Sequence, residues 1–480
     1  MRNFRSPLTR TTGSELRITA SDYLLYRRCP RSLHLRLIGA APPSHPADTR
    51  YPVPSDRLEV RDLALAHYSK ALTDPSCTHG PFVAAADVRR VQKPSGHAVI
   101  LVRDGTSVKE SYLREAAFVD FCFTRCGAKP QRIYVQHVNK AYRRCGPIDP
   151  DALFVQADVT RRVATIAPQT AEELERFSEE LEADPLLTRY HEVLCQRPRT
   201  CPSCSELLPE RDAGHVSRLH RGGPLVDELL GEGITRIVDI PPDRLRHRRH
   251  EIQQNSLRTE TPYVDARALR TFLDRLAYPV CYLDFEALCT AIPPFDHVRP
   301  WEHVPFLYSV HREQSDRAIS HAHYLMEPGK DSRVEMAERL ASDLDGCGSV
   351  VAYSAGFERG VLKRLMDVCP DAAVDLQHAV DRVVDLLEPF HEFAVYHHRQ
   401  RGKVSLKYVL PALTDLSYSG QTVCDGYTAN LVYRYLSSDE VPAESSGPAG
   451  AQLLADLVSY CALDTMAMVH VVRELRRMAS

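Results

Sequence analysis

The sequence predicts an α/β protein whose C-terminal part folds as a mixed sheet flanked by helices. Four short apolar runs bounded by turn residues are typical of buried strands: Val280–Phe285, Phe306–His311, Ala322–Met326 and Val350–Tyr353. Stretches with the helical spacing of apolar residues lie between and after these runs. The composition, 44% hydrophobic and 26% charged residues, is that of a globular chain.

The length and the apolar pattern limit the classes of protein to consider. A chain of 480 residues accommodates about two to four domains. No run reaches the ~18 apolar residues of a membrane helix, and the N-terminal segment lacks the apolar core of a secretory signal. We therefore expect a cytoplasmic protein without a membrane partner. Its 14 cysteines are then reduced thiols, and a cluster of them is a candidate metal site.

Four segments are expected along the chain: an α/β region over 1–170, a helix with a cysteine-rich segment over 171–215, a helical linker over 216–275 and the mixed-sheet domain over 276–480. In the first, strands Phe82–Val88 and Ala98–Arg103 are expected to form a hairpin around the turn Lys93–Gly96. Thr170 and Glu173 have the spacing of a capping box, which predicts a helix that begins at Thr170.

The order of elements in the last domain is informative. The first three strands precede helix Val334–Leu344, and the fourth strand precedes helices over Phe357–Leu365, Ala373–Val384 and Leu453–Met478. This is the order of an RNase H-like domain, in which a mixed sheet has helices on both faces.

Carboxylates occur at the ends of these elements. Asp284 and Glu286 end the first strand, and residues two apart on a strand share a face. Two acids on one side of a buried strand repel each other, which a divalent cation relieves. Tyr460 and Asp464 lie four residues apart in an apolar helical stretch, so they project together. Glu358 follows the apolar run Val350–Tyr353 in the first turn of a helix.

These three motifs resemble the four-carboxylate exonucleases of the DnaQ type. The resemblance implies that Asp284, Glu286, Glu358 and Asp464 bind two Mg²⁺ or Mn²⁺ ions and that Tyr460 orients the attacking water. The second motif normally carries Asp, so the longer Glu358 arm changes the geometry there. Asp385 is expected to be structural or to support the metal ligands, with a direct role as the alternative. Lys407 is expected to be solvated, with a phosphate contact as the alternative.

The chain as a whole resembles the bacterial family with the domain of unknown function 2779, preceded by a RecB-like nuclease region. The motifs that carry this resemblance are Tyr282-Leu-Asp-Phe-Glu286, Arg299-Pro-Trp-Glu-His-Val-Pro-Phe306, Val384-Asp-Leu-Leu-Glu-Pro-Phe390, Tyr460-Cys-Ala-Leu-Asp-Thr465 and, in the front half, Ser21-Asp-Tyr-Leu-Leu-Tyr-Arg-Arg-Cys-Pro30, Thr106-Ser-Val-Lys109 and His137-Val-Asn-Lys140.

The front half departs from the RecB-like PD-(D/E)XK pattern. Asp87 fits the first metal ligand, but the strand that should carry Glu-x-Lys has Leu101 and Arg103. Leucine cannot bind a metal, and arginine cannot act as a base at neutral pH. Val119 stands where a glutamine often follows. We expect a degenerate restriction-endonuclease-like fold that is retained for packing or DNA binding.

Four cysteines form a further candidate site. The RecB-like resemblance implies a 4Fe–4S cluster bound by Cys29, Cys195, Cys201 and Cys204. The alternative is Zn²⁺, which thiolates also suit, with His191 or His215 as a further ligand. A third interpretation is that the four thiols are unrelated.

The net charge of −3 limits nucleic-acid binding to local basic stretches. Leu225–Ile240, with the turn Gly231-Glu-Gly233, is similar to a helix-hairpin-helix DNA contact. We expect a metal-dependent 3′→5′ exonuclease acting on single-stranded DNA ends rather than RNA, with unknown protein partners. The alternative is a non-catalytic nucleic-acid-binding or regulatory subunit built on decayed nuclease folds. The basic stretches are Arg17, Arg27, Arg28, Arg31 and Arg36; Arg244, Arg246, Arg248 and Arg249; and Arg399, Arg401, Lys403 and Lys407.

Overall fold

The computed structural model describes residues 16–41, 51, 53, 55–68, 72–91, 96–193, 195, 201–205, 212–438 and 448–480. The chain forms two compact units. Unit 1 contains Met1–Pro209 and Cys289–Glu302, and unit 2 contains Glu210–Leu288 and His303–Ser480. The first two segments expected from the sequence fall largely in unit 1, and the last two fall largely in unit 2.

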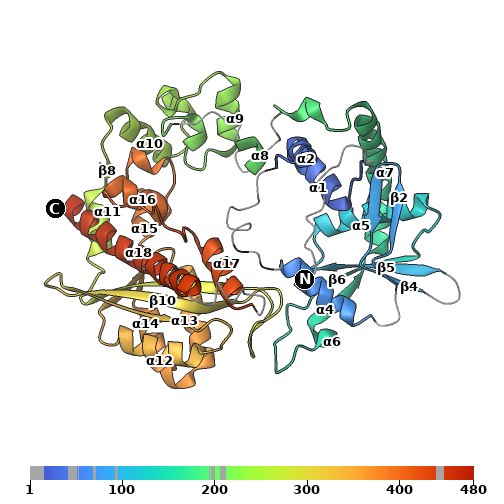
Figure 1. Ribbon diagram of the computed structural model, residues 1–480. Coiled ribbons are helices and arrows are strands. Elements are labelled where there is room, and N and C mark those ends of the chain that lie inside the picture. Colours follow the sequence, from blue (N-terminus) through green and yellow to red (C-terminus); the bar gives the residue numbers. More distant parts are fainter. Residues whose placement is uncertain are drawn as a thin grey trace. The chain divides into compact units, whose positions relative to one another are not determined.

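Unit 1 is built on a five-stranded mixed sheet of order β1-β4-β5-β6-β7. Strands β5 and β6 are parallel, and the other neighbouring pairs are antiparallel. Helices α1, α5 and α7 contribute to one apolar core with β5 and β6 (Figure 1). The bounds are β1 (Leu72–Thr73), β4 (Val88–Val91), β5 (His97–Arg103), β6 (Arg132–Val138), β7 (Phe154–Asp158), α1 (Ala20–Arg28), α5 (Glu110–Arg125) and α7 (Thr160–Ala183).

The predicted strand Phe82–Val88 is wrong in its extent. The chain leaves the strand at Ala86 and Asp87, where the Asp87 carboxylate accepts a hydrogen bond from the backbone of Val102 at 2.7 Å. β3 therefore pairs with β2, and β4 forms the hairpin with β5. Residues 93–95 of the predicted turn lie outside the described residues. The remaining elements of this unit are α2 (Pro30–Leu37), α4 (Asp56–Ala66), β2 (Ser76–His79), β3 (Phe82–Ala85), α6 (Pro150–Leu153), the 3₁₀ helix η1 (Thr188–Tyr190) and α8 (Pro202–Ser205).

The predicted helix start at Thr170 is also wrong, because α7 begins ten residues earlier at Thr160. Asp158 accepts a hydrogen bond from the Thr160 backbone at 2.9 Å, which satisfies a free N–H of the first turn. Glu173 is not a capping residue. It accepts a hydrogen bond from the Tyr23 hydroxyl at 2.6 Å and so ties α7 to α1.

Unit 2 contains a second five-stranded mixed sheet, of order β11-β10-β9-β12-β13. The four strands predicted from the sequence are present as β9, β10, β11 and β12. β10 and β11 are antiparallel, whereas β12 is parallel to both β9 and β13. The bounds are β9 (Val280–Cys289), β10 (His303–Glu313), β11 (Ile319–Leu325), β12 (Ser349–Ala352) and β13 (Val383–Asp385).

The predicted helix Ala373–Val384 is too long at its C-terminal end, where the structure has the fifth strand, β13. Helix α14 ends at Asp381, and the next residues pair in parallel with β12. Val383 and Val384 are β-branched and buried, which favours an extended edge of a sheet over a helix end.

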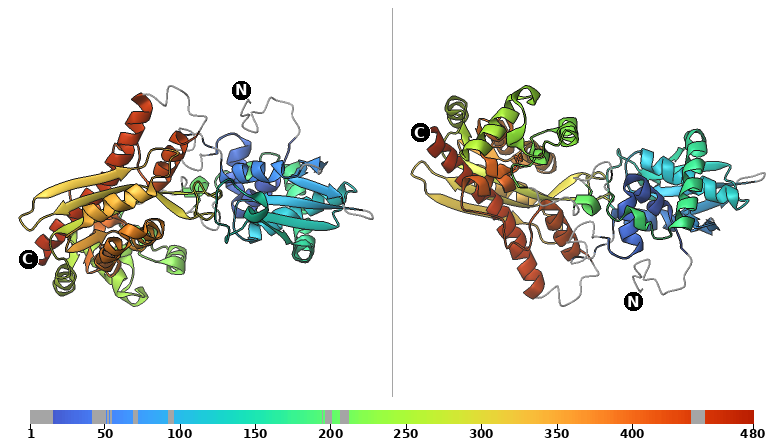
Figure 2. Two further views of the ribbon diagram at one scale, coloured as in Figure 1. Left: turned by 90° about the horizontal axis from the view of Figure 1, so that it is seen from below. Right: turned by 90° about the horizontal axis from the view of Figure 1, so that it is seen from above.

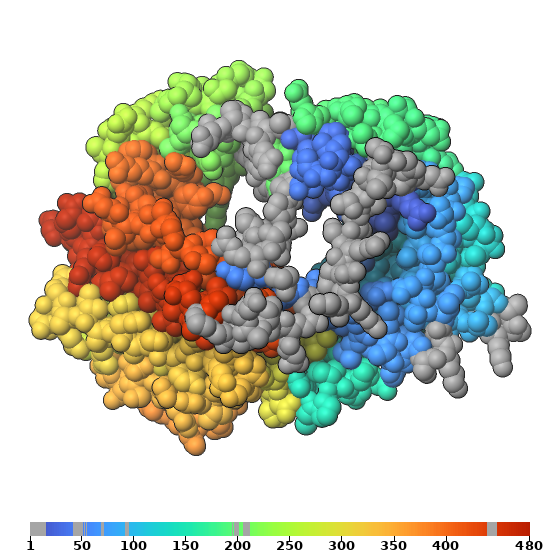
Figure 3. Space-filling model, viewed as in Figure 1, coloured from blue at the N-terminus to red at the C-terminus, as the bar shows by residue number. Residues whose placement is uncertain are grey.

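Helices cover both faces of this sheet (Figure 1). The long α18 lies across the strands (Figure 2) and packs on β10, α11, α16 and α17. In the space-filling view the orange and red segments of unit 2 form a continuous surface (Figure 3). The helices are α11 (Ala266–Leu273), α12 (Arg333–Leu344), α13 (Gly356–Val368), η6 (Pro370–Ala372), α14 (Ala373–Asp381), α15 (Glu388–His391), η7 (His398–Gln400), α16 (Leu406–Leu413), α17 (Gly426–Leu436) and α18 (Pro448–Ala479).

Helix α18 is long and apolar enough to cross a membrane by length and composition alone. Half of its most apolar window is buried, and Leu457, Val469 and Val472 lie in the core of unit 2. A core helix meets the same criteria, so this helix is weak support for a membrane span.

The helix-hairpin-helix predicted within Leu225–Ile240 is incomplete. Helix α9 ends at Gly231 and a turn follows at Gly233, as predicted. The next element is only a three-residue 3₁₀ helix, because Pro241 and Pro242 follow it and disfavour a helical residue before them. The other elements near this segment are η3 (Val216–Arg218), α9 (Gly223–Gly231), η4 (Ile237–Asp239), η5 (Pro242–Arg244), α10 (Arg248–Thr259), β8 (Tyr263–Val264) and β14 (Val395–Tyr396).

Candidate functional site

Three of the four predicted carboxylates meet in unit 2, and we call this cluster the acidic centre. Asp284 and Glu286 lie on β9, and alternation along the strand places both on one face. Asp464 comes from α18. One carboxylate oxygen from each residue lies within 4.8 Å of the others. The sheet and the helix that crosses it thus bring residues almost 200 positions apart into one cluster.

Glu358 acts on this cluster but does not belong to it, because the group of carboxylate oxygens within 4.8 Å of one another does not include Glu358. It occupies the first turn of α13 and is 3% exposed. Its Oε2 atom is buried and has no hydrogen-bond partner among the described residues. Its charge contributes to the raised pKa of Asp284, so the two carboxylates act on each other electrostatically.

Burial and mutual repulsion dominate the ionisation of these acids. Burial raises the pKa of Asp284 well above its usual value, and Asp464, Glu286 and Glu358 add to the effect. Burial and Asp464 raise the pKa of Glu286 to about 8. Burial, with a smaller contribution from Asp385, raises the pKa of Glu358 to about 7. The acidic centre therefore demands positive charge, which protons or cations can supply.

Tyrosine and cysteine side chains complete the walls of the acidic centre. Tyr418 donates a hydrogen bond to Asp464 Oδ1 at 2.5 Å, and the Cys461 thiol donates to Asp284 Oδ2 at 3.5 Å. Burial raises the pKa of Asp464, while hydrogen bonds from Tyr418 and Tyr460 oppose the rise. Tyr418 was missed in the sequence, because it lies in a loop without a periodic pattern and reaches Asp464 only through the tertiary fold.

Two further residues from the sequence analysis lie close to these acids. Asp385 accepts hydrogen bonds from the backbone N–H groups of Ser354 and Leu387 at 2.8 and 2.9 Å, which is the structural role expected for it. Lys407 was expected to be solvated. Instead its Nζ lies 5.5 Å from the ring centroid of Tyr460 and donates a hydrogen bond to Cys424 O.

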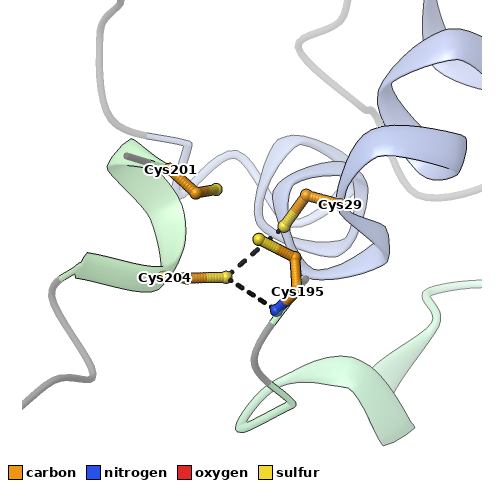
Figure 4. A group of neighbouring side chains, drawn as sticks. All are labelled: Cys29, Cys195, Cys201 and Cys204. Carbon is orange, nitrogen blue, oxygen red and sulfur yellow. Dashed lines mark hydrogen bonds between the residues drawn. The ribbon is translucent and has the colours of Figure 1, made fainter. Parts of the chain in front are cut away.

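A second cluster, the cysteine centre, lies in unit 1 (Figure 4). Sulfur atoms of Cys29, Cys195, Cys201 and Cys204 lie within 4.8 Å of one another. Cys29 is the N-cap of α2. Cys201 directly precedes α8, and Cys204 is the third residue of that helix. The Cys29 and Cys204 sulfurs are 3.5 Å apart. Four convergent thiols are a donor set for iron–sulfur or zinc.

Hydrogen bonds tune this second cluster. Burial raises the pKa of Cys201, but hydrogen bonds from Ser32 and from the Cys204 backbone lower it to about 7. The group within 4.8 Å contains neither of the two histidines considered from the sequence. His191 bonds instead to His34 at 3.0 Å, and His215 to Ser217. A metal here would be held by four sulfurs.

Part of the chain, mostly in unit 2, is similar to a known protein family. Residues 281–405 match the family model "Domain of unknown function (DUF2779)". The matched region carries Asp284, Glu286 and Glu358 and ends before Lys407 and Asp464. No curated protein sequence matches the chain. The solved structure titled "Crystal structure of SSO0001" aligns with 40% of this chain and 89% of that chain, at 15% identity and a TM-score of 0.23.

Outside the DUF2779 match, unit 1 holds a different acidic site. Asp87 and Glu115 both bind the guanidinium of Arg103, at 2.9 and 2.6 Å. Arg103 is 2% exposed, while Leu101 and Val119 are fully buried in the core. Arg57 and Arg61 from α4 reach the same two carboxylates. Of the side chains that departed from a nuclease pattern in the sequence, Arg103 thus lies in a closed ion-pair network, and Leu101 and Val119 pack in the core.

The basic stretches are partly neutralised within their own units. Arg244 and Arg246 bind Glu228 and Glu232, and Arg249 binds Glu392. In the first stretch Arg27 binds Glu173 and Arg36 binds Asp22. Lys403 and Arg401 of the third stretch are exposed. Of the three, the third stretch keeps the most charge available to a polyanion.

Proposed function

We propose that unit 2 is a metal-dependent 3′→5′ exonuclease of the RNase H-like, DnaQ type. The observation that carries the proposal is the convergence of Asp284, Glu286 and Asp464 within 4.8 Å. The order of elements, with three strands before the first helix and two parallel strands after it, supports the fold assignment. The DUF2779 match covers the first two of the three motifs of this resemblance, Asp284 with Glu286 and then Glu358.

The side chains present fit divalent cations. Carboxylate oxygens are the ligands that Mg²⁺ and Mn²⁺ prefer. Burial and repulsion hold the pKa of Asp284 far above normal, so positive charge is favoured there. The buried Glu358 Oε2 atom lacks a hydrogen-bond partner in the described part of the chain and can serve as a further ligand. We propose two ions at this centre.

The reaction we propose is hydrolysis of the last phosphodiester bond of a strand. Divalent ions supply an activated water and stabilise the charge on the leaving oxygen. A water oxygen bonds to phosphorus and the bond from phosphorus to the 3′-oxygen breaks. The water proton passes to solvent and the 3′-oxygen gains a proton. The products are a 5′-mononucleotide and a strand shortened by one nucleotide.

The chain's own residues orient these groups. Asp284 and Glu286 are fixed by the β9 backbone, and Asp464 is fixed by its hydrogen bond from Tyr418. The Tyr460 hydroxyl lies beside Asp464, where the DnaQ resemblance gives it the role of orienting the water. Single-stranded DNA ends are the substrate we propose, because the exposed Arg399 and Arg401 of the third basic stretch offer positive charge for one backbone.

The test is a cleavage assay on 3′-end-labelled and 5′-end-labelled single-stranded DNA, duplex DNA and RNA, with Mg²⁺ or Mn²⁺ and with EDTA. We expect a ladder from the 3′ end with the wild type and its loss in Asp284→Asn. Asp456→Asn, on α18 two turns before Asp464, is the control and should keep activity. The absence of metal-dependent cleavage on every substrate would contradict the proposal.

One observation favours a second function, a non-catalytic nucleic-acid-binding or regulatory subunit. In unit 1 the RecB-like resemblance predicts a metal where the structure has Arg103 bound to Asp87 and Glu115. We propose that unit 1 is a decayed nuclease fold without catalytic metal. Binding of labelled DNA without cleavage by the whole protein would support the subunit function.

For the cysteine centre we propose a 4Fe–4S cluster. All four thiols converge without a histidine, and Cys201 is ready to ionise near neutral pH. Protein purified without oxygen should absorb near about 400 nm and contain iron and sulfide. One zinc per chain without this absorbance would identify a zinc site instead.

A further inference from the structure

Lys407 is a half-buried cation beside the acidic centre that the reaction described above leaves unused. It lies in the first turn of α16, and Leu406, Val409 and Leu410 of that helix are buried in the core. A positive side chain at a helix N-terminus opposes the helix dipole. The stability of α16 therefore does not explain a lysine at this position.

The ammonium group is held toward the acids. Its Nζ donates a hydrogen bond to Cys424 O at 2.5 Å. It lies 5.5 Å from the ring centroid of Tyr460 and 5.9 Å from that of Tyr418. Both tyrosines interact with Asp464. The positive charge of Lys407 lowers the pKa of Glu286 and of Asp464 against the larger effect of burial.

Lys407 has no ion-pair partner within the described part of the chain. Another cation that acts on these acids, Arg359, affects Glu358, but its guanidinium donates to Val383 O at 2.7 Å. Of the three donors on the lysine ammonium, one is used by Cys424 O. Donors remain for a ligand that approaches the acidic centre.

The chemistry of the centre identifies that ligand. Two divalent cations balance the four carboxylates, and beside them Asp425 and Lys407 act on Glu286 with opposite charges. The remaining lysine donors suit an anion with hydrogen-bond acceptors, and a phosphodiester is the anion of the proposed reaction. We infer that Lys407 binds a non-bridging oxygen of the scissile phosphate at the acidic centre. This inference rests on the proposed metal-dependent function of the same site.

The test separates phosphate binding from metal binding. The variants are Lys407→Met and Lys407→Arg, and Lys403→Met, at an exposed lysine, is the matched control. Calorimetry measures Mn²⁺ binding, and then binding of thymidine 5′-monophosphate to the Mn²⁺-loaded protein. We expect Lys407→Met to bind the nucleotide about tenfold more weakly or worse, the loss typical of one charge-assisted hydrogen bond. Its Mn²⁺ affinity should stay equal or rise, because a repelling cation has been removed. Lys407→Arg should stay within about threefold of the wild type for the nucleotide.

Opposite results overturn the inference. Unchanged nucleotide binding in Lys407→Met, or a loss equal to that in Lys403→Met, would show that the phosphate lies elsewhere. Weaker Mn²⁺ binding in Lys407→Met would make the lysine a structural counter-ion of the acids. Wild-type protein that binds Mn²⁺ and the nucleotide through Lys407 but degrades no strand would contradict the exonuclease proposal and leave the phosphate site standing.

Discussion

Units 1 and 2 both bury carboxylates beside a mixed sheet, yet they balance that charge in different ways. In unit 1, Asp87 and Glu115 share the guanidinium of Arg103. In unit 2, Asp284, Glu286 and Asp464 face one another, and no arginine in the described part of the chain forms an ion pair with them. The first site balances its charge within the chain, whereas the second holds more carboxylates than the one lysine beside it, Lys407, can balance.

The physical consequences differ accordingly. Arg103 stays charged at every pH that a folded protein meets, and its planar group binds two carboxylates in fixed directions. Such a site cannot exchange its cation. At the acidic centre the charge that Lys407 does not balance can be met by protons or metal ions, which exchange with solvent. Of the two acidic sites, only the one in unit 2 can therefore exchange its counter-charge.

The largest effect is expected from Arg103→Met. The variant leaves Asp87 and Glu115 buried with less counter-charge, and breaking a buried ion pair costs about 3–5 kcal/mol. The single tryptophan, Trp301, belongs to unit 1 and donates a hydrogen bond to Asp104 O. Its fluorescence during urea unfolding therefore reports the free energy of unfolding of this unit.

Arg125→Met is the matched control for this prediction, because Arg125 forms an exposed pair with Glu175. It should change stability by at most about 1 kcal/mol. If Arg103→Met also lowered the free energy of unfolding by less than about 1 kcal/mol, the internal cation would be dispensable. The contrast between the two units would then fail.

The next effect concerns metal ions in unit 2. Mn²⁺ at one hundred times its dissociation constant should stabilise the protein by about 2.7 kcal/mol. Asp284→Asn should remove this stabilisation and leave the metal-free protein as stable as the wild type or more so, because one repelling carboxylate is gone. Calorimetric melting with Mn²⁺ and with EDTA measures both quantities.

Asp87→Asn provides the mirror experiment. It should destabilise unit 1 and preserve the Mn²⁺ effect, since Asp87 is bound to Arg61 and Arg103. If Asp87→Asn removed the Mn²⁺ stabilisation and Asp284→Asn did not, the assignment of closed and open sites would be reversed.

The sequence predicted unit 2 better than unit 1 for a physical reason. Alternation places Asp284 and Glu286 on one face of a strand, and the four-residue spacing joins Tyr460 to Asp464. These are local rules. Tyr418 and Lys407 join the site through a loop and a short helix, and no local pattern marks such long-range contacts.

Unit 1 shows the converse. Leu101 and Arg103 were visible as departures from a nuclease pattern, but the partner Glu115 was not predicted. Its position follows from how α5 packs on β5, which the spacing of residues does not reveal. The strand β13 was assigned to a helix because Val383 and Val384 continue the apolar spacing of α14, and only pairing with β12 decides the outcome.

A smaller effect is expected from pH. The pKa values of Glu286 and Glu358 are about 8 and about 7 in the folded chain, above the usual 4.5. A carboxyl group with a raised pKa stabilises the fold while it is protonated, and this stability is lost as the pH rises through the folded pKa. The metal-free protein should therefore lose stability progressively between pH 5 and pH 8.

Urea unfolding in EDTA, followed by far-ultraviolet circular dichroism, measures this loss. Saturating Mn²⁺ should flatten the profile, and calorimetry in buffers of different ionisation enthalpy should detect protons released as Mn²⁺ binds below pH 8. A metal-free profile that is flat over this range would show that burial does not protonate the acidic centre.

The smallest effect is expected from a pair of tyrosines, one in each unit. Tyr418 donates to Asp464 at 2.5 Å and Tyr23 donates to Glu173 at 2.6 Å, so each variant to phenylalanine removes one similar hydrogen bond. Such a bond contributes about 1 kcal/mol. In unit 1 the loss should appear only as reduced stability. In Tyr418→Phe the freed Asp464 becomes less well oriented, so Mn²⁺ affinity should fall about three- to tenfold, the equivalent of that energy.

Equal Mn²⁺ affinities in Tyr418→Phe and Tyr23→Phe would mean that Tyr418 only stabilises the fold. The backbone elements alone would then orient the acidic centre.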